Sequence, residues 1–366
     1  MAFVRRVQIS NLRNIHSATL DGLKQINVLS GPNGAGKTSV LEALSLLGMG
    51  RSFRSRKINT VITSGQEAVT VFAELSLDND SRCRIGISRS QDNVEIKIDG
   101  QAMQSASGLA SRLPLLVFDA DVFQLVEGGP SRRREYIDWV LFHVEHQRFY
   151  PCWTGYYRAL KQRNELLKRG NIQPEELDPW DKALERYGHG LSELRAACLD
   201  RLAALVGAAE LDFGVGPLSL VLSRGWKEGV SLSAALKTSR EKDVRYKTTS
   251  VGPHRMALNI LVGGLPAKDI LSRGQIKMLA SQLKLAAARL VVSRTQSNVL
   301  ILLDDLAAET DEASRKRLLS DMAGGGFQCF ITGVFVDDVT KMIPEGIKKA
   351  VFHVEHGCIK KSSNYE

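Results

Sequence analysis

The sequence has few cysteines, no long apolar run and no internal repeat. Its five cysteines are scattered and form no C-x-x-C pair, which argues against a zinc site or a disulfide framework and favours reduced thiols. The longest apolar runs, such as Val299–Leu303, are far too short to cross a membrane. The first residues, MAFVRRVQISNLRNI, lack the apolar centre of a signal peptide. We therefore expect a cytoplasmic protein with no membrane partner.

The composition is that of a globular protein with an excess of positive charge. Hydrophobic residues make up 43% of the 366 residues and charged residues 24%, enough apolar material for two or three domains or one large split domain. The formal net charge is +9, and the isoelectric point is about 9.3. This charge indicates a polyanionic partner, most simply a nucleic acid.

The spacing of apolar residues changes twice along the chain. This predicts an α/β fold interrupted by a mainly helical lobe. Short runs of alternating apolar and polar residues predict strands in the first third. These strands are Phe3–Ser10, Ile26–Ser30, Val69–Leu77, Arg84–Ser88 and Val94–Ile98. From about Asp121 the spacing of apolar residues is that of helices, and in the last part of the chain predicted strands and helices alternate again. We expect residues 1–120 and 290–366 to form one lobe and residues 121–289 to form the other.

Residues 31–38 fit the pattern G-x-x-x-x-G-K-[ST] of a phosphate-binding P-loop at every fixed position. They are Gly31, Pro32, Asn33, Gly34, Ala35, Gly36, Lys37 and Thr38. The segment lies between a predicted strand and a predicted helix, Thr38–Leu47, as a P-loop requires. Its glycines let backbone N–H groups surround phosphates, Lys37 is placed to neutralise them, and the Thr38 hydroxyl can ligate Mg²⁺. The sequence therefore predicts a nucleoside triphosphate site with Mg²⁺.

A second site element follows the apolar run Val299–Leu303, which has the composition of a buried parallel strand. Asp304 and Asp305 come directly after this run. Asp304 is predicted to hold Mg²⁺, directly or through water, and Asp305 to position or deprotonate the attacking water. Between Lys37 and Asp304 lie 266 residues, too many for a compact small GTPase. The helical lobe is therefore expected to be an insertion within one ATPase.

The segment Leu271–Lys277, LSRGQIK, places a polar turn directly before a predicted helix. N–H groups at a helix N-terminus, beside a Ser hydroxyl, suit a phosphate. Between a P-loop and the acids, the segment resembles the S-G-G-Q signature of ABC-type ATPases, whose Ser contacts the γ-phosphate of ATP held by the other subunit. The resemblance implies that Ser272, Gly274 and Gln275 bind ATP across a dimer.

With these motifs, the chain resembles the RecF family of bacterial recombination-mediator ATPases along its whole length. The stretches that carry the resemblance are LRNI (12–15), GPNGAGKTSVLEA (31–43), GRSFR (50–54), VEGGPSRRREYID (126–138), ALKQRNELL (159–167), GPHR (252–255), LSRGQIK (271–277) and LLDDLAAETD (302–311). The resemblance implies an ABC-type ATPase head like those of SMC and Rad50 proteins, with a helical lobe that lacks a long coiled coil. It also implies ATP and Mg²⁺ as cofactors, an ATP-dependent homodimer, DNA binding at gaps or single-strand/double-strand junctions, and the partners RecO and RecR in loading recombinase.

Some positions depart from the family pattern. Residues 118–121 read FDAD where members usually carry F-x-P-E-D, and residues 256–257 follow GPHR as Met-Ala where two acids are usual. No Q-loop residue is assigned, and the role of GPHR stays open. Ala308–Asp311 stands at the dimer-interface D-loop of such ATPases. Thr332 stands where many carry a switch histidine, and it has no basic nitrogen with which to sense a γ-phosphate.

Basic residues cluster after the P-loop helix and again on one predicted helix of the second lobe. The first cluster has four cations within seven residues and no acid, which suits contacts with a DNA backbone. It consists of Arg51, Arg54, Arg56 and Lys57. The alternative is a solvated basic loop without a partner. The second cluster, expected to face DNA or a partner, consists of Arg158, Lys161, Arg163, Lys168 and Arg169.

Three functions fit these motifs. In the first, ATP held between two subunits closes a dimer on DNA, and hydrolysis releases it. Asp305 is one methylene shorter than the glutamate common in ABC enzymes, so slow turnover is expected. The second function is that of a transport ATPase subunit, and the third is that of an adaptor that binds ATP without hydrolysing it. DNA-stimulated ATPase activity would separate the first function from the other two.

Overall fold

The computed structural model describes residues 3–77, 81–170, 172–207, 213–295, 297–305 and 311–362. The chain forms two compact units. One unit comprises Met1–Val122 together with Val291–Glu366, and the other comprises Phe123–Leu290. The chain therefore leaves the first unit and returns to it, so that residues from both ends of the sequence build one body.

The first unit contains a six-stranded antiparallel sheet in the order β2-β1-β4-β5-β6-β7. Its strands are β1 (Phe3–Leu12), β2 (Ile15–Asp21), β4 (Ala68–Ser76), β5 (Arg82–Ser90), β6 (Val94–Ile98) and β7 (Gln101–Met103). Apolar and polar residues alternate along them. In β4, Val69 and Val71 are buried while Thr70 is exposed. One face of this sheet therefore joins the core, and the other carries polar side chains into solvent.

A second six-stranded sheet of the same unit has the order β15-β14-β3-β13-β12-β8. Its strands are β3 (Ile26–Ser30), β8 (Leu115–Phe118), β12 (Leu300–Leu303), β13 (Gln328–Gly333), β14 (Lys349–Glu355) and β15 (Cys358–Lys361). All neighbours pair parallel except β14 and β15. Every residue of β3, β12 and β13 is buried, as expected for strands covered on both faces. The P-loop follows β3 and the acids follow β12, so both lie at the carboxyl edge of this sheet.

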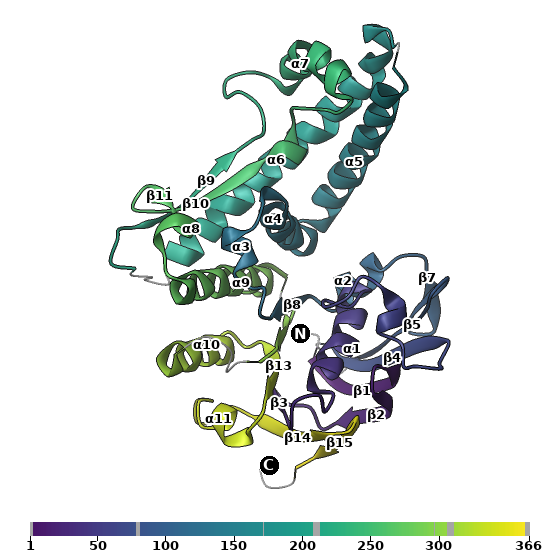
Figure 1. Cartoon of the computed structure of the whole chain (residues 1–366), viewed down its shortest axis with the longest axis vertical. Coiled ribbons are helices and arrows are strands. Elements are labelled where there is room, and N and C mark those ends of the chain that lie inside the picture. The colour runs from purple at the N-terminus through teal and green to yellow at the C-terminus, as the bar shows by residue number, and fades with distance from the viewer. Residues whose placement is uncertain are drawn as a thin grey trace. The chain divides into compact units, whose positions relative to one another are not determined.

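Helix α1 (Lys37–Met49) contacts both sheets, with β1, β4 and β5 of the antiparallel sheet and β8 and β13 of the parallel sheet as neighbours. One hydrophobic core joins the three layers and includes Leu41 and Leu44 of α1, Val71 of β4 and Phe330 of β13. Helices α10 (Glu312–Gly324) and α11 (Val336–Thr340) lie on the other side of the parallel sheet (Figure 1). The described part of this unit also contains two short elements, 3-10 helix Ile58–Thr60 and α2 (Ser107–Arg112).

The second unit is mainly helical. Its helices are α3 (Gln124–Glu127), α4 (Pro130–Val144), α5 (His146–Arg169), α6 (Asp178–Gly207), α7 (Leu232–Tyr246) and α8 (Ala267–Ile270), with 3-10 helices at Pro174–Leu177 and Pro253–Arg255. A small antiparallel sheet has the order β11-β10-β9, from β9 (Leu218–Ser223), β10 (Ala257–Val262) and β11 (Leu265–Pro266). Helices α5 and α6 pack along each other (Figure 1). Helix α9 (Arg273–Thr295) begins in this unit and ends in the first.

The helical spacing of the sequence continues from Arg132 to Arg169, but the structure breaks this stretch at Glu145. This residue has φ −127° and ψ 34°, outside the helical region, and separates α4 from α5. The break occupies a single residue and leaves the helical periodicity intact on either side, so the pattern alone does not reveal it. Among the described residues, no helix combines the length and apolar character needed to cross a membrane.

Candidate nucleotide site

The P-loop begins where β3 ends, and its first glycine is required by the neighbouring strand. Gly31 has φ +147°, and a Cβ at this position would lie 2.1 Å from the carbonyl oxygen of Val354 in β14. Gly36 has φ +115° and forms the N-cap of α1 in the left-handed region. Side chains are disfavoured at both positions, so the backbone turns tightly from strand to helix. This turn places the first N–H groups of α1 where a helix N-terminus can bind the predicted phosphates.

Lys37 folds back over the loop that it follows. Its Nζ donates to the carbonyl oxygens of Gly31, at 2.7 Å, and Pro32, at 2.9 Å. Partial burial lowers the pKa of Lys37, and the nearby carboxylates of Asp305 and Asp304 act in the opposite direction. The ammonium group therefore lies between the loop and the two acids, where a phosphate can replace the carbonyls as its partner.

The two acids meet the P-loop through hydroxyl groups. Thr38 Oγ1 donates to Asp304 Oδ1 at 2.9 Å, although 266 positions separate the two residues. Thr332, at the end of β13, donates from Oγ1 to the same Asp304 oxygen at 2.9 Å. The Thr332 hydroxyl also accepts a hydrogen bond from the backbone N–H of Asp305 at 2.8 Å. A carboxylate beside a hydroxyl is a donor set that suits Mg²⁺, so Thr38 and Asp304 fit the ion predicted there.

Asn14, in the turn between β1 and β2, also touches the P-loop. Its Nδ2 donates to the carbonyl oxygen of Ala35 at 3.0 Å, and its Oδ1 accepts from Ser39 Oγ at 3.3 Å. No chemical motif in the sequence predicted a role for this residue. Its only signal was its place in the family-like stretch LRNI, which carries no chemistry of its own.

The signature residues form a capping box at the start of α9. The backbone N–H of Ser272 donates to Gln275 Oε1 at 2.9 Å, and the backbone N–H of Gln275 donates to Ser272 Oγ at 3.4 Å. Ser272 and Gly274 are exposed. This reciprocal pair satisfies two N–H groups at the helix start and holds the Ser hydroxyl at the exposed N-terminus of α9. Ser272, Gly274 and Gln275 belong to the second unit, whereas Lys37 and Asp304 belong to the first.

The D-loop assignment falls largely outside the described residues. Of Ala308–Asp311, only Asp311 is described, and it forms the N-cap of α10 by accepting from the backbone N–H of Ser314 at 2.8 Å.

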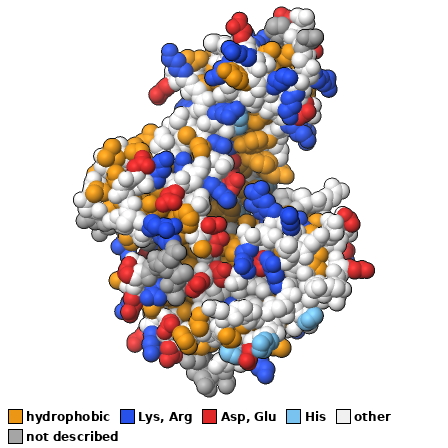
Figure 2. Space-filling model, viewed as in Figure 1, with side chains coloured by type: hydrophobic (Ala, Val, Ile, Leu, Met, Phe, Trp, Pro, Cys, Tyr) orange, Lys and Arg blue, Asp and Glu red, His pale blue; other side chains and the backbone are white. Residues whose placement is uncertain are grey.

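The first basic cluster lies on an exposed loop after α1. Arg51, Arg54, Arg56 and Lys57 are all exposed. Arg54 Nη1 lies 3.8 Å from Glu42 Oε2, and 53% of the Arg54 side chain remains accessible. Lys and Arg side chains also gather in small groups elsewhere on the visible face of each unit (Figure 2). The four cations therefore keep charge available for an anionic partner.

The prediction that Arg163 belongs to a basic surface on α5 is wrong, because this residue is completely buried. Its Nε donates to Asp181 Oδ1 at 2.7 Å, and its Nη1 donates to Asp243 Oδ2 at 2.8 Å and to Thr249 Oγ1 at 2.9 Å. A buried guanidinium requires such partners because removing an unpaired charge from water is costly. Arg163 therefore joins α5, α6 and α7 within the helical unit and contributes nothing to a basic surface.

The GPHR segment lies beside this buried network. The Nε2 of His254 bonds to the carbonyl oxygen of Thr249 at 3.0 Å, and its Nδ1 bonds to Tyr156 OH at 2.7 Å. A carbonyl only accepts, so Nε2 carries the proton and Nδ1 accepts from the tyrosine. Burial lowers the pKa of His254 to about 4. His254 is thus held as a neutral imidazole, and Arg255 of the same segment donates to the carbonyl oxygen of Thr249 at 3.0 Å.

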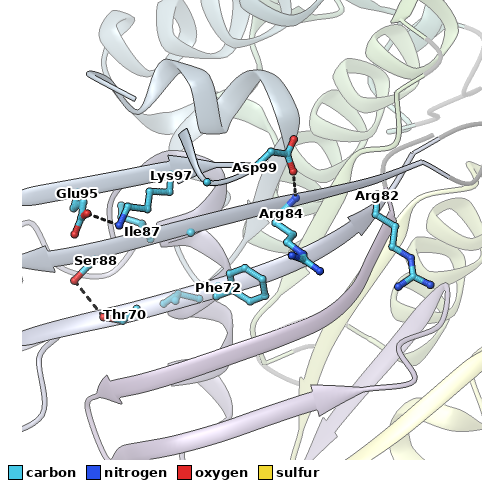
Figure 3. Close-up of a pocket in the computed structure, with 12 residues that line it drawn as sticks. Thr70, Phe72, Arg82, Arg84, Ile87, Ser88, Glu95, Lys97 and Asp99 are labelled. Carbon is cyan, nitrogen blue, oxygen red and sulfur yellow. Dashed lines mark hydrogen bonds and ion pairs between the residues drawn. The ribbon is translucent and has the colours of Figure 1, made fainter. Parts of the chain in front are cut away.

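A shallow pocket of about 660 Å³ lies on the outward face of the antiparallel sheet (Figure 3). Its lining includes Phe72 and the cations Arg82, Arg84 and Lys97, and Lys97 is paired with Glu95 at 2.7 Å. None of the predicted nucleotide-site residues lines it. The pocket and the P-loop are therefore separate features of the first unit.

A P-loop after one parallel strand, and acids after a strand two positions away in the same sheet, place the chain in the class of P-loop nucleotide-binding proteins. The chain matches the family model "RecF/RecN/SMC N terminal domain" over residues 3–360. It is 38% identical to the DNA replication and repair protein RecF of Pseudoalteromonas atlantica, over 98% of this chain and 99% of that protein. It is also 38% identical to RecF of Cellvibrio japonicus, over 97% of this chain and 98% of that protein. The chain belongs to the RecF family of DNA replication and repair proteins.

Solved structures agree with this family. A structure of the recombination mediator protein RecF with ATP, from the RecFOR pathway, matches with a TM-score of 0.86 and 26% identity, over 99% of this chain and 98% of that chain. An SMC head bound to the winged-helix domain of ScpA matches with a TM-score of 0.59 and 14% identity, over 98% of this chain and 97% of that chain. The fold is therefore that of an SMC-like head with a helical second unit in place of a long coiled coil.

Proposed function

We propose that the chain binds ATP with Mg²⁺ at the P-loop. The observation that carries this proposal is the 2.9 Å contact between Thr38 Oγ1 and Asp304 Oδ1, which brings together the two oxygen donors expected to hold the ion. A bound Mg²⁺ supplies positive charge that neutralises the phosphates during transfer. Lys37 then exchanges its bonds to Gly31 and Pro32 for bonds to phosphate oxygens. The relative solved with ATP supports the same choice of nucleotide.

We propose slow ATP hydrolysis, with Asp305 orienting the attacking water. The backbone N–H of Asp305 is held by Thr332, and its φ of +55° lies in the left-handed region, so its position at the end of β12 is well defined. Its short side chain reaches one methylene less far than a glutamate would. A water bound to this carboxylate is therefore held less closely to the γ-phosphorus of ATP, which slows hydrolysis.

We propose that two copies enclose ATP between the P-loop of one and Ser272 of the other. The exposed N-terminus of α9 offers N–H groups and a hydroxyl, which suit the γ-phosphate. ATP that contacts both subunits binds the dimer better than the monomer, so it shifts the equilibrium toward the dimer. Hydrolysis removes that bridging phosphate and releases the pair.

We propose that the dimer clamps DNA at gaps or single-strand/double-strand junctions through Arg51, Arg54, Arg56 and Lys57. These exposed cations suit backbone contacts, which position a protein without reading sequence. The name RecFOR of the pathway in which the solved relatives act supports RecO and RecR as partners. Loading recombinase on the gapped DNA is then the biological outcome.

Sedimentation with and without ATP and gapped duplex tests the dimer. We expect ATP to convert the wild type to a dimer that carries DNA. Lys37→Met removes the phosphate partner, so the variant should stay at its ATP-free sedimentation coefficient. Ser272→Arg should bind ATP as a monomer with unchanged affinity but fail to pair. If ATP leaves the wild-type sedimentation coefficient unchanged, the sandwich proposal is wrong.

Ser231→Arg is the matched control for Ser272→Arg. Ser231 is an exposed N-cap in the same unit, and its side chain accepts from the backbone N–H of Ala234 at 3.2 Å. Losing either cap should cost about 1 kcal/mol of stability. Only Ser272→Arg should block pairing, and an equal failure to pair in both variants would assign the effect to the caps.

ATPase assays with gapped DNA separate this function from its alternatives. We expect low activity that DNA increases. A transport ATPase subunit should ignore DNA, and a purely structural adaptor should release no phosphate from ATP.

A further inference from the structure

The P-loop helix carries a completely buried carboxylate. Glu42 lies four positions after Thr38 on α1, and its side chain has no exposed surface. An ionised carboxylate in such a place requires strong partners, because burial without them is very unfavourable. The partners of Glu42 are Arg13 and Ser52.

Arg13 is the first partner of Glu42. Its Nε donates to Oε2 and its Nη2 donates to Oε1, both at 2.9 Å. The hydrogen bond to Glu42 raises the pKa of Arg13. Two parallel bonds of this kind fix the plane and orientation of the carboxylate. Glu42 is thus held by the turn between β1 and β2, far from it in the sequence.

Ser52 is the second partner, and it belongs to the basic loop. Its Oγ donates to Glu42 Oε1 at 2.6 Å and accepts from the backbone N–H groups of Arg54 and Ser55, both at 3.1 Å. Ser55 Oγ in turn accepts from the backbone N–H of Lys57 at 3.2 Å. The backbone that carries Arg54, Arg56 and Lys57 is therefore attached through Ser52 to the buried carboxylate.

The same turn that holds Glu42 also holds the P-loop. Arg13 has φ +55°, in the left-handed region, and the next residue, Asn14, donates to the carbonyl oxygen of Ala35 at 3.0 Å. The P-loop and the basic loop are thus linked through two consecutive residues, Asn14 and Arg13, and through Glu42.

We propose that Glu42 is a positioning residue that holds the basic loop, residues 51–57, in the shape in which it contacts DNA. The proposal rests on the proposed role of this loop in DNA binding. It predicts an effect opposite in sign to simple electrostatics. Removing a negative charge beside Arg54 would by itself strengthen binding to polyanionic DNA. Removing the loop's anchor should instead weaken binding, because ordering four cations then costs conformational entropy when DNA binds.

Two variants test the role of Glu42. Glu42→Gln removes the charge and weakens the bonds to Arg13 and Ser52. Ser52→Ala removes the link to the loop, changes no charge and leaves the Glu42–Arg13 pair in place. With ATP and Mg²⁺ present, we expect both to weaken binding to gapped duplex by about tenfold. The slope of log affinity against log salt concentration should become shallower by about 0.9 for each phosphate that the loop no longer neutralises. ATP affinity, measured without DNA, should stay within about twofold of wild type because the P-loop keeps its own contacts.

Glu95→Gln is the charge-matched control, because Glu95 is half exposed on β6 and also pairs with a cation, Lys97. It should leave DNA binding unchanged or slightly stronger. Tighter DNA binding by Glu42→Gln would overturn the proposal and make Glu42 a mere counter-charge to Arg54. Loss of ATP affinity in both Glu42→Gln and Ser52→Ala would also overturn it, by assigning Glu42 to the nucleotide site.

Arg54→Ala combined with Arg56→Ala separates this inference from the proposed function. If the double variant binds DNA as well as wild type, the basic loop is not the DNA site and the proposed function fails at that point. If the double variant binds weakly while Glu42→Gln and Ser52→Ala bind normally, the DNA site stands and the positioning role of Glu42 is wrong.

Discussion

At the scale of single residues, the nucleotide site depends on hydroxyl groups that link charged residues. Thr38 and Thr332 both donate to Asp304 Oδ1, and Thr332 also accepts from the N–H of Asp305. The residue that stands at the switch-histidine position therefore connects both acids through one oxygen. It needs no charge for this role, because its partners are a carboxylate and a backbone amide.

We expect Thr332→Val to lower the kcat of ATP hydrolysis about tenfold, the effect typical of losing a residue that orients a metal ligand. The valine keeps the volume but leaves Asp304 one donor short and the Asp305 amide without an acceptor. ATP affinity should change little, because the P-loop contacts are intact. Steady-state kinetics with Mg²⁺ measures both quantities.

Thr332→Ser is the control for this substitution, because it restores the hydroxyl. It should recover most of the wild-type kcat. If Thr332→Val hydrolyses ATP as fast as wild type, the hydroxyl bridge has no catalytic importance.

At the scale of elements, the helical unit is joined by buried polar groups. Arg163 of α5 contacts Asp181 of α6 and Asp243 of α7, and Arg195 of α6 makes two bonds to Asp138 of α4 and one to the carbonyl oxygen of Pro253. Such pairs demand one arrangement of the helices, because any other would leave a buried charge without a partner. The GPHR segment is held within this arrangement through Pro253 and His254.

His254 makes the stability of this unit depend on pH. Its pKa is lowered to about 4 in the folded state, chiefly by burial, so between its ordinary pKa near 6.5 and about 4 the unfolded chain binds a proton that the folded chain does not. Stability is therefore complete above about pH 6.5 and falls as the pH is lowered, by at most about 3 kcal/mol from this residue. Urea unfolding from pH 7 to 4.5 measures the decline.

His254→Gln should reduce this pH dependence, because glutamine can donate and accept hydrogen bonds but does not titrate. The variant will be less stable at pH 7, and its slope against pH is the informative quantity. If the free energy of unfolding of wild type and variant changes equally with pH, the role assigned to His254 is wrong.

At the scale of the whole molecule, the groups proposed to surround one ATP lie in two units of the chain. The P-loop and both acids belong to the first unit, and Ser272 belongs to the second. In a symmetric dimer each site would combine the first unit of one copy with the second unit of its partner. Neither copy can then complete a site alone.

Mixing two inactive variants should therefore restore activity. In a heterodimer of Lys37→Met and Ser272→Arg, one site carries both substitutions and the other carries neither. Because neither variant is expected to pair with itself, the dimers in an equal mixture are heterodimers with one intact site of two, so the mixture should reach at most about half of the wild-type DNA-stimulated ATPase rate. Each variant alone should be nearly inactive. A mixture no more active than its components would indicate that Ser272 acts on the ATP of its own chain.

Much of the fold could be predicted from local patterns. The strands Ile26–Ser30 and Val94–Ile98 are confirmed to the residue. The strand predicted at Arg84–Ser88 extends to Arg82–Ser90, because pairing with β4 continues through polar positions. The pattern missed β10, whose six residues form a strand by pairing with β9.

The sequence by itself determined the chemistry of the P-loop, because residues 31–38 are consecutive and their glycines and Lys37 act within one turn. It also determined that acids follow a buried strand. Only the tertiary structure decided that Thr38 and Asp304 touch, because the order β3-β13-β12 brings their strands together. It alone decided that Arg163 is buried and that Glu42 accepts a hydrogen bond from Ser52 of the basic loop. A charge pairs with whatever the fold places beside it, and no local pattern records that partner.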